Sequence, residues 1–241
     1  MRIYINAEEM IEETKRDLAE MGIVVRPATM QDKYIKGNPD YETREPQNYS
    51  YCLLDAKSQD IPGVIQPWAD AEFKERIHDP WTRNEFGEAY GSPRFLNPGN
   101  AWELRREVWT EYLHFGKMAY TYNELIWNND QVTKIINRLK EDPDSRQLWI
   151  SLWNPDKDPD FLGGVSRVPC SLGYGLQVRD GKLNLHYVMR SCDFATHFRN
   201  DVYLAIKFLE WVAEKTGYLV GSLTHTIFSL HVYNKDVEGV F

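Results

Sequence analysis

Residues 176–217, which read LQVRDGKLNLHYVMRSCDFATHFRNDVYLAIKFLEWVAEKTG, decide the fold class of this protein. Two apolar runs of β-type composition, Leu176–Val178 and Leu183–Val188, flank the segment Arg179–Lys182. That segment contains an Asp-Gly pair, which is typical of the turn in a tight hairpin. The stretch therefore predicts two antiparallel strands joined by a short turn.

A long helix is expected after this hairpin. Beyond Asp201, apolar residues recur at helical spacing until Gly217, which is expected to end the helix. These apolar residues are Val202, Ala205, Ile206, Leu209, Val212 and Ala213. The same patterns predict other helices at Ala7–Glu20, Pro67–Ile77 and Gln131–Lys140, and strands at Leu148–Trp153 and Leu223–Tyr233. Strands that bracket long apolar helices predict an α+β domain.

Length and composition describe one ordinary globular domain. The chain has 241 residues, with 28 Lys and Arg against 36 Asp and Glu, and a formal net charge of −8. We expect a single domain over residues 1–241, because this length permits one large core. The acidic balance argues against direct binding of nucleic acid. Apolar runs too short for a bilayer, together with a charged N-terminus, predict a cytoplasmic protein.

The three cysteines, Cys52, Cys170 and Cys192, are too few and too scattered for a disulfide framework. None forms the close pair that suggests zinc, and no metal is expected. Cys170 lies in a loop before a predicted strand, three residues after Arg167. A nearby positive charge lowers the pKa of a thiol from about 8.5 and makes it a nucleophile at neutral pH. The alternative is a buried structural thiol.

Three further groups suit a polar ligand. Arg190 and Ser191 offer a guanidinium and a hydroxyl to a phosphate monoester, although a solvated arginine at a strand end is the alternative. His231 and Tyr233 alternate along a predicted strand and share a face, as residues in core or edge packing also do. Asp201 precedes the long helix, where a helix-capping or first-turn carboxylate is the default explanation.

The order and spacing of these groups say more than any one of them. Four segments carry the pattern, namely Pro169-Cys170, Met189–Asp193, Phe198–Asp201 and Ser229–Tyr233. In this order the chain resembles the thymidylate synthase superfamily, which includes the phage deoxycytidylate hydroxymethylases. Three upstream segments are also similar to family features, namely Asp142–Arg146, Tyr122 and Trp68–Glu72.

The resemblance implies an α+β fold of thymidylate synthase type, with a mixed sheet packed by long helices and a homodimer formed through the sheet. It also implies that a cysteine thiolate attacks C6 of a pyrimidine nucleotide, so that C5 takes the methylene group of the co-substrate 5,10-methylenetetrahydrofolate. Cys170 takes the role of that thiolate, and Tyr122 matches the active-site tyrosine. Glu72 matches the catalytic glutamate, with Glu85 and Glu88 as alternatives.

The resemblance also assigns residues to the phosphate. Arg190 and Ser191 match phosphate ligands, and Arg44 matches the phosphate arginine of an N-terminal loop. Arg146 matches an arginine that the neighbouring subunit lends to the site. Gln147 departs from the pattern, because a second arginine commonly follows the first.

Other positions match residues near the folate and the sugar. Asp193 matches a residue near the folate pterin and the substrate, and Trp109 is expected to contact the folate. His231 and Tyr233 match groups that touch the sugar hydroxyl, and they would serve ribose or deoxyribose.

Asp201 bears on the choice of base, because the synthases that use uracil place an asparagine there. Cytosine presents an N4 amino donor and an unprotonated N3 acceptor, whereas uracil reverses both. A carboxylate receives a hydrogen bond from N4, and a shared proton bridges it to N3. Since the phage hydroxymethylases carry aspartate at this position, we expect a cytidine monophosphate, and dCMP in particular.

The product depends on whether water or hydride reaches the methylene intermediate. Only eight residues follow Tyr233, and a short C-terminal segment is expected to leave the site wetter. This favours 5-hydroxymethyl-dCMP, made for nucleotide biosynthesis and phage DNA modification in a host cytoplasm. The alternatives are a dCMP methyltransferase, a divergent thymidylate synthase acting on dUMP, and a nucleotide-binding module without turnover.

Overall fold

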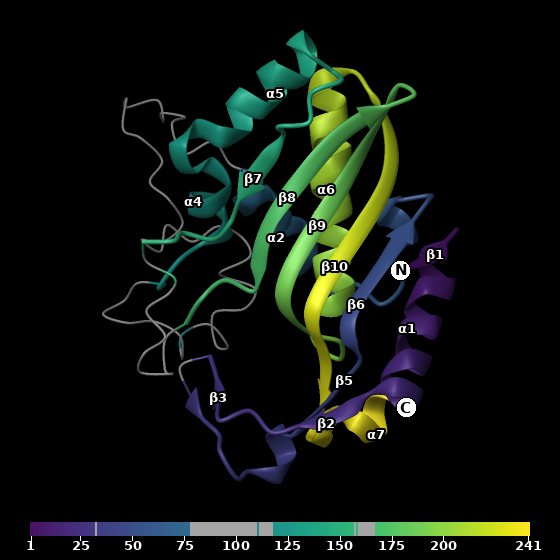
Figure 1. Ribbon diagram of the computed structural model, residues 1–241, viewed down its shortest axis with the longest axis vertical. Helices are drawn as coiled ribbons and strands as arrows, with labels where there is room; N and C mark the ends of the chain where they lie inside the picture. Colours follow the sequence, from purple (N-terminus) through teal and green to yellow (C-terminus); the bar gives the residue numbers. More distant parts are fainter. Residues whose placement is uncertain (32, 78–109, 111–117, 157, 159–166) are drawn as a thin grey trace.

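The computed structural model describes residues 1–241 except 32, 78–109, 111–117, 157 and 159–166. Eight strands of the described residues form one mixed sheet, ordered β1-β6-β10-β9-β8-β7, with β5 also pairing β10 and β2 pairing β5 (Figure 1). The strands are β1 (Arg2–Tyr4), β2 (Ile23–Val25), β5 (Thr43–Glu45), β6 (Gln47–Leu53), β7 (Trp149–Ser151), β8 (Ser171–Arg179), β9 (Lys182–Asp193) and β10 (Leu219–Tyr233). A separate small hairpin pairs β3 (Thr29–Met30) with β4 (Lys33–Tyr34).

The helices lie beside and behind this sheet. They are α1 (Ala7–Met21), α2 (Trp68–Ile77), α4 (Tyr122–Trp127), α5 (Gln131–Glu141), α6 (Phe198–Thr216) and α7 (Val237–Val240). Helix α6 runs along one face of β9 and β10, and α2 packs against α6 (Figure 1). Along the described part of the chain, no helix crosses the opposite face of β8, β9 and β10 in this view.

The predicted hairpin is confirmed, and both of its strands are longer than expected. Asp180 and Gly181 have φ values of 51° and 73°, so both central residues of the turn are left-handed. This is the turn geometry that an Asp-Gly pair accommodates and that matches the twist of paired strands. Strands β8 and β9 then continue to Ser171 and Asp193, beyond the apolar runs visible in the sequence.

Helix α6 begins earlier than the apolar periodicity indicated. It starts at Phe198, and the backbone N–H of Asp201 already donates to the carbonyl of His197. Asp201 is therefore a residue of the first helical turn rather than the residue before the helix. The end at Gly217 is confirmed, with a left-handed φ of 80° that suits glycine.

The other predicted helices are confirmed to within one residue at each end, as α1, α2 and α5. Several described elements have no counterpart in the sequence-based expectations, namely the strands β1 to β6 and the helices α4 and α7. Strand β6 lies between β1 and β10 in the sheet, and although it contains polar residues it buries the side chains of Tyr49 and Tyr51 in the core. A periodicity of apolar residues alone misses a strand that buries tyrosine.

A stack of aromatic rings fills the space between the sheet and α6. The imidazole of His225 stacks on the ring of Tyr187, with ring centroids 4.6 Å apart. The ring of Phe198 on α6 lies next to the rings of His225 and Tyr51. The hydroxyl of Tyr51 is 3.0 Å from His225 Nδ1. His225 is fully buried, and this burial lowers its pKa to about 3.

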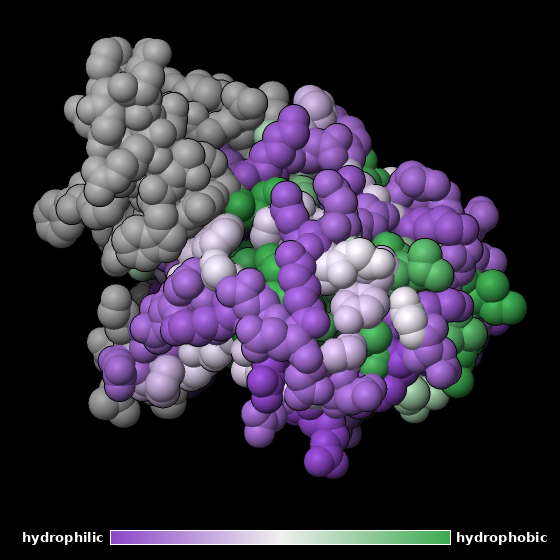
Figure 2. Space-filling view, turned by 90° about the horizontal axis from the view of Figure 1, so that it is seen from above, coloured by the Kyte–Doolittle hydropathy of each residue, from purple (hydrophilic) through white to green (hydrophobic). Residues whose placement is uncertain are grey.

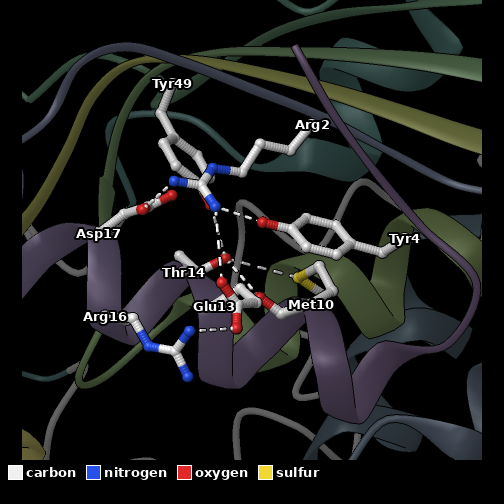
Figure 3. A network of polar contacts seen from close by, with 8 residues as sticks. All are labelled: Arg2, Tyr4, Met10, Glu13, Thr14, Arg16, Asp17 and Tyr49. Carbon is white, nitrogen blue, oxygen red and sulfur yellow. Dashed lines mark hydrogen bonds and ion pairs between the residues drawn. The ribbon is translucent and has the colours of Figure 1, made fainter.

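A polar network fastens the N-terminal elements to the sheet (Figure 3). The guanidinium of Arg2 on β1 forms an ion pair with Asp17 on α1, and Thr14 Oγ1 lies 2.9 Å from the hydroxyl of Tyr49 on β6. Asp17 is buried, and burial raises the pKa of its carboxyl even though Arg2 lowers it. These contacts hold α1 beside the sheet through hydrogen bonds as well as apolar packing.

The end of the molecule seen in Figure 2 is mostly hydrophilic, with hydrophobic residues in small separate groups. Among the described helices, none is both long enough and apolar enough to cross a membrane.

We expect His225 to make the stability of the protein depend on pH. The unfolded chain protonates this histidine near pH 6.5, whereas the folded protein does so near pH 3, so the folded state loses stability as the pH falls below 6.5. The free energy of unfolding should fall by about 2 kcal/mol between about pH 7 and pH 5 through this residue. Urea denaturation of the wild type and of His225→Phe measures the effect, and equal pH slopes in the two proteins would contradict it.

Candidate active site

A cavity of about 370 Å³ opens where β9 and β10 end and β8 begins. Strands β9 and β10 are parallel, so their carboxyl ends lie at the same edge of the sheet, and antiparallel β8 starts at that edge. The first turn of α6 and helix α2 close the cavity from the side. Most of the residues singled out from the sequence line it, namely Glu72, Tyr122, Cys170, Ser191, Asp193, Asp201, His231 and Tyr233.

Cys170 lies directly before β8, in a loop that Arg190 holds in place. Arg190 Nε donates to the carbonyl of Pro169 at 2.8 Å, and its Nη2 donates to the carbonyl of Val168 at 3.0 Å. The same Nη2 lies 3.8 Å from Cys170 Sγ. Arg190, which was expected to bind a phosphate, therefore holds the loop that carries the thiol.

The pKa of Cys170 does not follow the sequence-based expectation. Burial raises the pKa of this thiol, and this effect exceeds the lowering by Arg190 and Arg167. The nearby carboxyl of Asp201 raises the pKa further, and the side chain of Gln31 lowers it. The free protein therefore holds Cys170 as a thiol, and a step that removes its proton must precede any attack.

Glu72 projects from α2 and pairs with Arg76 one helical turn later. Arg76 Nε and Nη2 both donate to Glu72 Oε1, at 3.1 and 2.5 Å, and both side chains are at least nine-tenths buried. The guanidinium also lies over the ring of Tyr122, 4.3 Å from its centroid. Sequence reasoning missed Arg76, and the available signal was its i,i+4 spacing from Glu72.

Tyr122 connects this ion pair to the loop of the nucleophile. It begins α4, which a capping box of Thr121 and Glu124 starts. The hydroxyl of Tyr122 accepts a hydrogen bond from the backbone N–H of Ser171 at 3.3 Å, directly after Cys170. Burial raises the pKa of Tyr122 well above its ordinary value, so its hydroxyl keeps its proton.

Asp201 faces the cavity from the first turn of α6. The thiol of Cys192 on β9 donates to Asp201 Oδ2 at 3.5 Å. Burial is the largest cause that raises the pKa of Asp201, and the charge of Glu72 adds to it, whereas His197 and Arg76 lower it. This carboxyl therefore takes up a proton more readily than an exposed aspartate does.

Asn200, beside Asp201, was not among the predicted site residues. It is buried and lines the cavity, and its Oδ1 accepts a hydrogen bond from the backbone N–H of Ile65 at 3.0 Å. This bond ties the segment before α2 to α6. The amide Nδ2 of Asn200 is buried without a hydrogen-bond partner in the described residues, so it is a donor for a ligand in the cavity.

His231 and Tyr233 lie side by side near the end of β10, with ring centroids 5.0 Å apart, and both line the cavity. His231 Nδ1 is 3.3 Å from Ser229 Oγ, which in turn donates to Glu45 Oε2 at 2.8 Å. Strand β5 therefore orients the imidazole through a short chain of polar contacts.

Other predicted site residues lie away from the cavity wall. Arg44 lies on β5 opposite Val232, and Arg146 is exposed in the turn between α5 and β7. Neither of them lines the cavity, and Arg190 does not line it either. Trp109, Glu85 and Glu88 lie outside the described residues. The cavity is also lined by positively charged residues that were not predicted to belong to the site, namely Arg76, Arg167 and Lys235.

Among the described residues, no group of three or more His, Cys, Asp or Glu side chains is arranged to hold a metal ion. The cavity is lined instead by the thiols of Cys170 and Cys192, both of raised pKa, and by carboxyls, buried donors and aromatic rings. This set suits nucleophilic attack on a planar, polar ring.

We expect iodoacetamide to alkylate Cys170 slowly at neutral pH and faster as the pH rises through a midpoint above the ordinary thiol value of about 8.5. Because the charge of Arg190 lowers the pKa of the thiol, Arg190→Met should move that midpoint upward. Arg179→Met, at the exposed end of β8, serves as the control and should leave it unchanged. Mass spectrometry of the alkylated peptide measures both, and a midpoint at or below about 8.5 would contradict the raised pKa.

Comparisons with known proteins agree with this geometry. A family model described as "Thymidylate synthase" matches residues 70–241. A "Putative thymidylate synthase" of Methanosarcina acetivorans is 35% identical over 93% of this chain and 95% of its own length. One of Methanosarcina barkeri is 28% identical over the same shares.

Solved structures share the fold. The thymidylate synthase of T4 phage has a TM-score of 0.67 at 18% identity, covering 95% of this chain and 77% of its own. The thermostable thymidylate synthase A of Bacillus subtilis has a TM-score of 0.69 at 21% identity, covering 96% of this chain and 81% of its own. The expected α+β fold of this type is confirmed, and the chain belongs to the thymidylate synthase family.

Proposed function

We propose that this protein transfers a one-carbon unit from 5,10-methylenetetrahydrofolate to C5 of dCMP and releases 5-hydroxymethyl-dCMP. Membership of the thymidylate synthase family supports the coarser part, a folate-dependent transfer to a pyrimidine nucleotide. One observation supports the choice of cytosine. The carboxyl of Asp201 lines the same cavity as the Cys170 thiol, and its pKa is raised.

The proposed reaction begins at Cys170. Its thiol loses a proton, and the sulfur forms a bond to C6 of the pyrimidine, so that the electrons of the C5–C6 double bond make C5 nucleophilic. Arg190, 3.8 Å from the sulfur, favours the thiolate once the base displaces water from the cavity. The folate, when bound, would supply the methylene group that C5 accepts. C5 would then lose its hydrogen as a proton, water would add to the methylene carbon, and the bond between C6 and sulfur would break to return the Cys170 thiolate.

The residues present fit such a reaction. Glu72 Oε2, Arg76 Nη1 and Asn200 Nδ2 are buried polar atoms without protein partners among the described residues. Such atoms are stable in a native protein when a ligand or water satisfies them. Together they offer one acceptor and two donors to a polar ring system in the cavity.

The carboxyl of Asp201 can recognise cytosine when the carboxyl is protonated. A protonated carboxyl presents one O–H donor and one acceptor oxygen, which pair with N3 and the N4 amino group of cytosine. Burial favours this neutral form by raising the pKa of Asp201. The thiol of Cys192 donates to Oδ2 and thereby limits how the carboxyl can rotate.

The phosphate and sugar would meet the end of the cavity nearest β10. Ser191, His231 and Tyr233 line it, as Arg167 and Lys235 do. We propose that the hydroxyl of Ser191 and these positive charges bind the phosphate, and that His231 and Tyr233 bind the sugar hydroxyl. Arg190 would also bind the phosphate, through the guanidinium N–H groups that do not donate to the carbonyls of Val168 and Pro169.

We also propose that residues 1–241 form one domain that acts as a homodimer through the open face of the sheet. The cavity wall runs from Met30 to Lys235, so both ends of the chain contribute to one site. Trp149 on β7 and Phe228 on β10 are about half exposed, at 47% and 51%. Exposed aromatic residues on a sheet face are typical of an interface between subunits. Arg146, exposed at the end of the described sheet, would then enter the neighbouring cavity.

The product distinguishes the proposal from its alternatives. Incubation with dCMP, formaldehyde and tetrahydrofolate should yield 5-hydroxymethyl-dCMP without dihydrofolate, because water rather than hydride reaches the methylene carbon. Mass spectrometry identifies the product, and absorbance follows dihydrofolate. Formation of dihydrofolate with dCMP would show a methyltransferase, and formation with dUMP alone would show a thymidylate synthase. Equal inertness of the wild type and Cys170→Ala, with nucleotide still bound, would show a binding module.

We expect Asp201→Asn to move the preference of the enzyme from dCMP toward dUMP. A mismatched buried donor or acceptor costs about 1–3 kcal/mol, so the ratio of kcat/KM for the two nucleotides should change by roughly 5- to 150-fold. Asp180→Asn is the matched control, because Asp180 is exposed in the hairpin turn and asparagine tolerates its left-handed backbone. An unchanged ratio in Asp201→Asn would contradict the role of Asp201.

A further inference from the structure

A row of three buried hydroxyl groups, which the proposed reaction does not use, lies behind the wall of the cavity. The hydroxyl of Ser171, at the start of β8, is hydrogen bonded to the hydroxyl of Tyr187 on β9. One side-chain hydrogen bond joins Tyr187 to Tyr174 on β8, and another joins Tyr174 to Arg76 on α2. The three hydroxyl-bearing side chains are almost fully buried, and none of them lines the cavity that the described residues form. This hydroxyl row therefore connects the loop of the nucleophile to the helix that carries Glu72.

We propose that the hydroxyls of Tyr174 and Tyr187 hold the loop of the nucleophile and the carboxyl of Glu72 in fixed relative positions, so that both tyrosines are positioning residues. At one end of the row, the serine lies directly after Cys170 in the chain. At the other end, Arg76 donates through Nε and Nη2 to the carboxyl of Glu72. The inference rests on the proposed function in taking Cys170 as the nucleophile and Glu72 as a residue of the same site.

A second set of contacts joins the two ends of the hydroxyl row. The backbone N–H of Ser171 donates to the hydroxyl of Tyr122 at 3.3 Å, and the guanidinium of Arg76 lies 4.3 Å from the centroid of the Tyr122 ring. The contacts therefore close a ring through β8, β9, α2 and α4. A shift of the nucleophile's loop relative to α2 would disturb both routes at once, which is how supporting residues keep a site in one geometry.

The rings of the two tyrosines are themselves held in place by packing. Tyr174 stacks on Phe208 of α6 with ring centroids 5.0 Å apart, and Tyr187 stacks on His225 at 4.6 Å. The rings of Tyr174 and Tyr187 are 4.9 Å apart. Because these aromatic contacts fix the rings, the positions of the two hydroxyls are fixed as well.

Core packing by itself does not require these hydroxyls. Phenylalanine makes the same ring contacts, and a buried hydroxyl loses its hydration in exchange for a hydrogen bond of modest net value. Burial raises the pKa of Tyr174 and raises that of Tyr187 well above its ordinary value, so both hydroxyls keep their protons. A neutral hydroxyl both donates and accepts, which a continuous row of hydrogen bonds needs. The two tyrosines are therefore better suited to joining polar groups than to filling the core.

The first test compares high-resolution crystal structures of the full chain, as the wild type and as the double variant Tyr174→Phe/Tyr187→Phe. In the wild type we expect single positions for the Cys170 sulfur and the Glu72 carboxyl. In the double variant the distance between them should change by more than about 0.5 Å, or one of the two side chains should occupy two positions. Unchanged positions in the double variant, or a wild type without the continuous row of hydrogen bonds, would overturn the proposal. This test needs no activity.

The second test measures release of tritium from dCMP and from dUMP labelled at C5, which reports loss of the C5 hydrogen whichever product forms. Tyr174→Phe and Tyr187→Phe should each lower kcat by roughly tenfold or more, because a small misplacement of reacting groups slows the reaction. The KM for the nucleotide should change by less than about threefold, since neither hydroxyl reaches the cavity. The double variant should lose little more than the more affected single variant, because both hydroxyls belong to one row. A wild-type kcat in either single variant, or additive losses in the double variant, would overturn the proposal.

Tyr218→Phe is the matched control, because it also removes one tyrosine hydroxyl from a hydrogen bond. The hydroxyl of Tyr218 donates to the carbonyl of Leu139 at 3.0 Å, and neither residue lines the cavity. This variant should lower Tm by about 2–4 °C, as the loss of one hydrogen bond does in a chain of this size, and leave kcat unchanged. An equal loss of kcat in Tyr218→Phe would show that destabilisation explains the effect, and would overturn the proposal.

Thermal unfolding of each variant separates folding from function. If Tyr187→Phe does not fold, Ser171→Ala removes the same hydrogen bond from its other side, and the same fall in kcat is expected. A wild type that releases no tritium from either nucleotide would refute the proposed function, whereas the two crystal structures would still decide whether the tyrosines position the loop and Glu72.

Discussion

The packing of α6 against β9 and β10 is the constraint on which the rest of the structure depends. Its apolar stripe is almost completely buried, as Val202, Ala205 and Leu209 are, and burial of such side chains is the main favourable term in folding. Because the helix starts at Phe198, its first turn presents Asn200 and Asp201 at the edge where β9 and β10 end. The packing of α6 that forms the core therefore also places Asn200 and Asp201 in the cavity.

Burial then determines the chemistry of the cavity. It raises the pKa of Cys170, Tyr122 and Asp201, so each of these groups favours its protonated form before a ligand enters. Arg190 and Arg76 oppose this effect where they approach Cys170 and Asp201. A low dielectric strengthens every such interaction between charged groups in the cavity.

Two arginines, Arg190 and Arg76, illustrate how positive charge is used here. Arg190 was expected to bind a phosphate, but its contacts with Val168 and Pro169 also hold the loop of the nucleophile. Arg76 lies inside the cavity wall and holds one oxygen of Glu72. In both cases the planar guanidinium makes two hydrogen bonds at once, to two carbonyls for Arg190 and to one carboxylate oxygen for Arg76.

The sequence by itself determined the elements that local patterns encode. The helices over Ala7–Met21 and Gln131–Glu141 and the Asp-Gly hairpin follow from periodicity and turn chemistry, which act between residues close in the chain. The order of the segments around Cys170, Asp193, Asp201 and His231 likewise indicated the family. Strand β6 was not predicted from the sequence, because it buries tyrosines rather than aliphatic residues.

Only the tertiary structure decided the state of the site. The raised pKa of Cys170, the contact of Cys192 with Asp201 and the buried pair of Glu72 with Arg76 each join residues whose burial depends on distant segments. Spacing along the chain shows that Glu72 and Arg76 can meet, but it does not show whether water surrounds them. Desolvation is a property of the folded whole, and it is the term that sets the charges in this cavity.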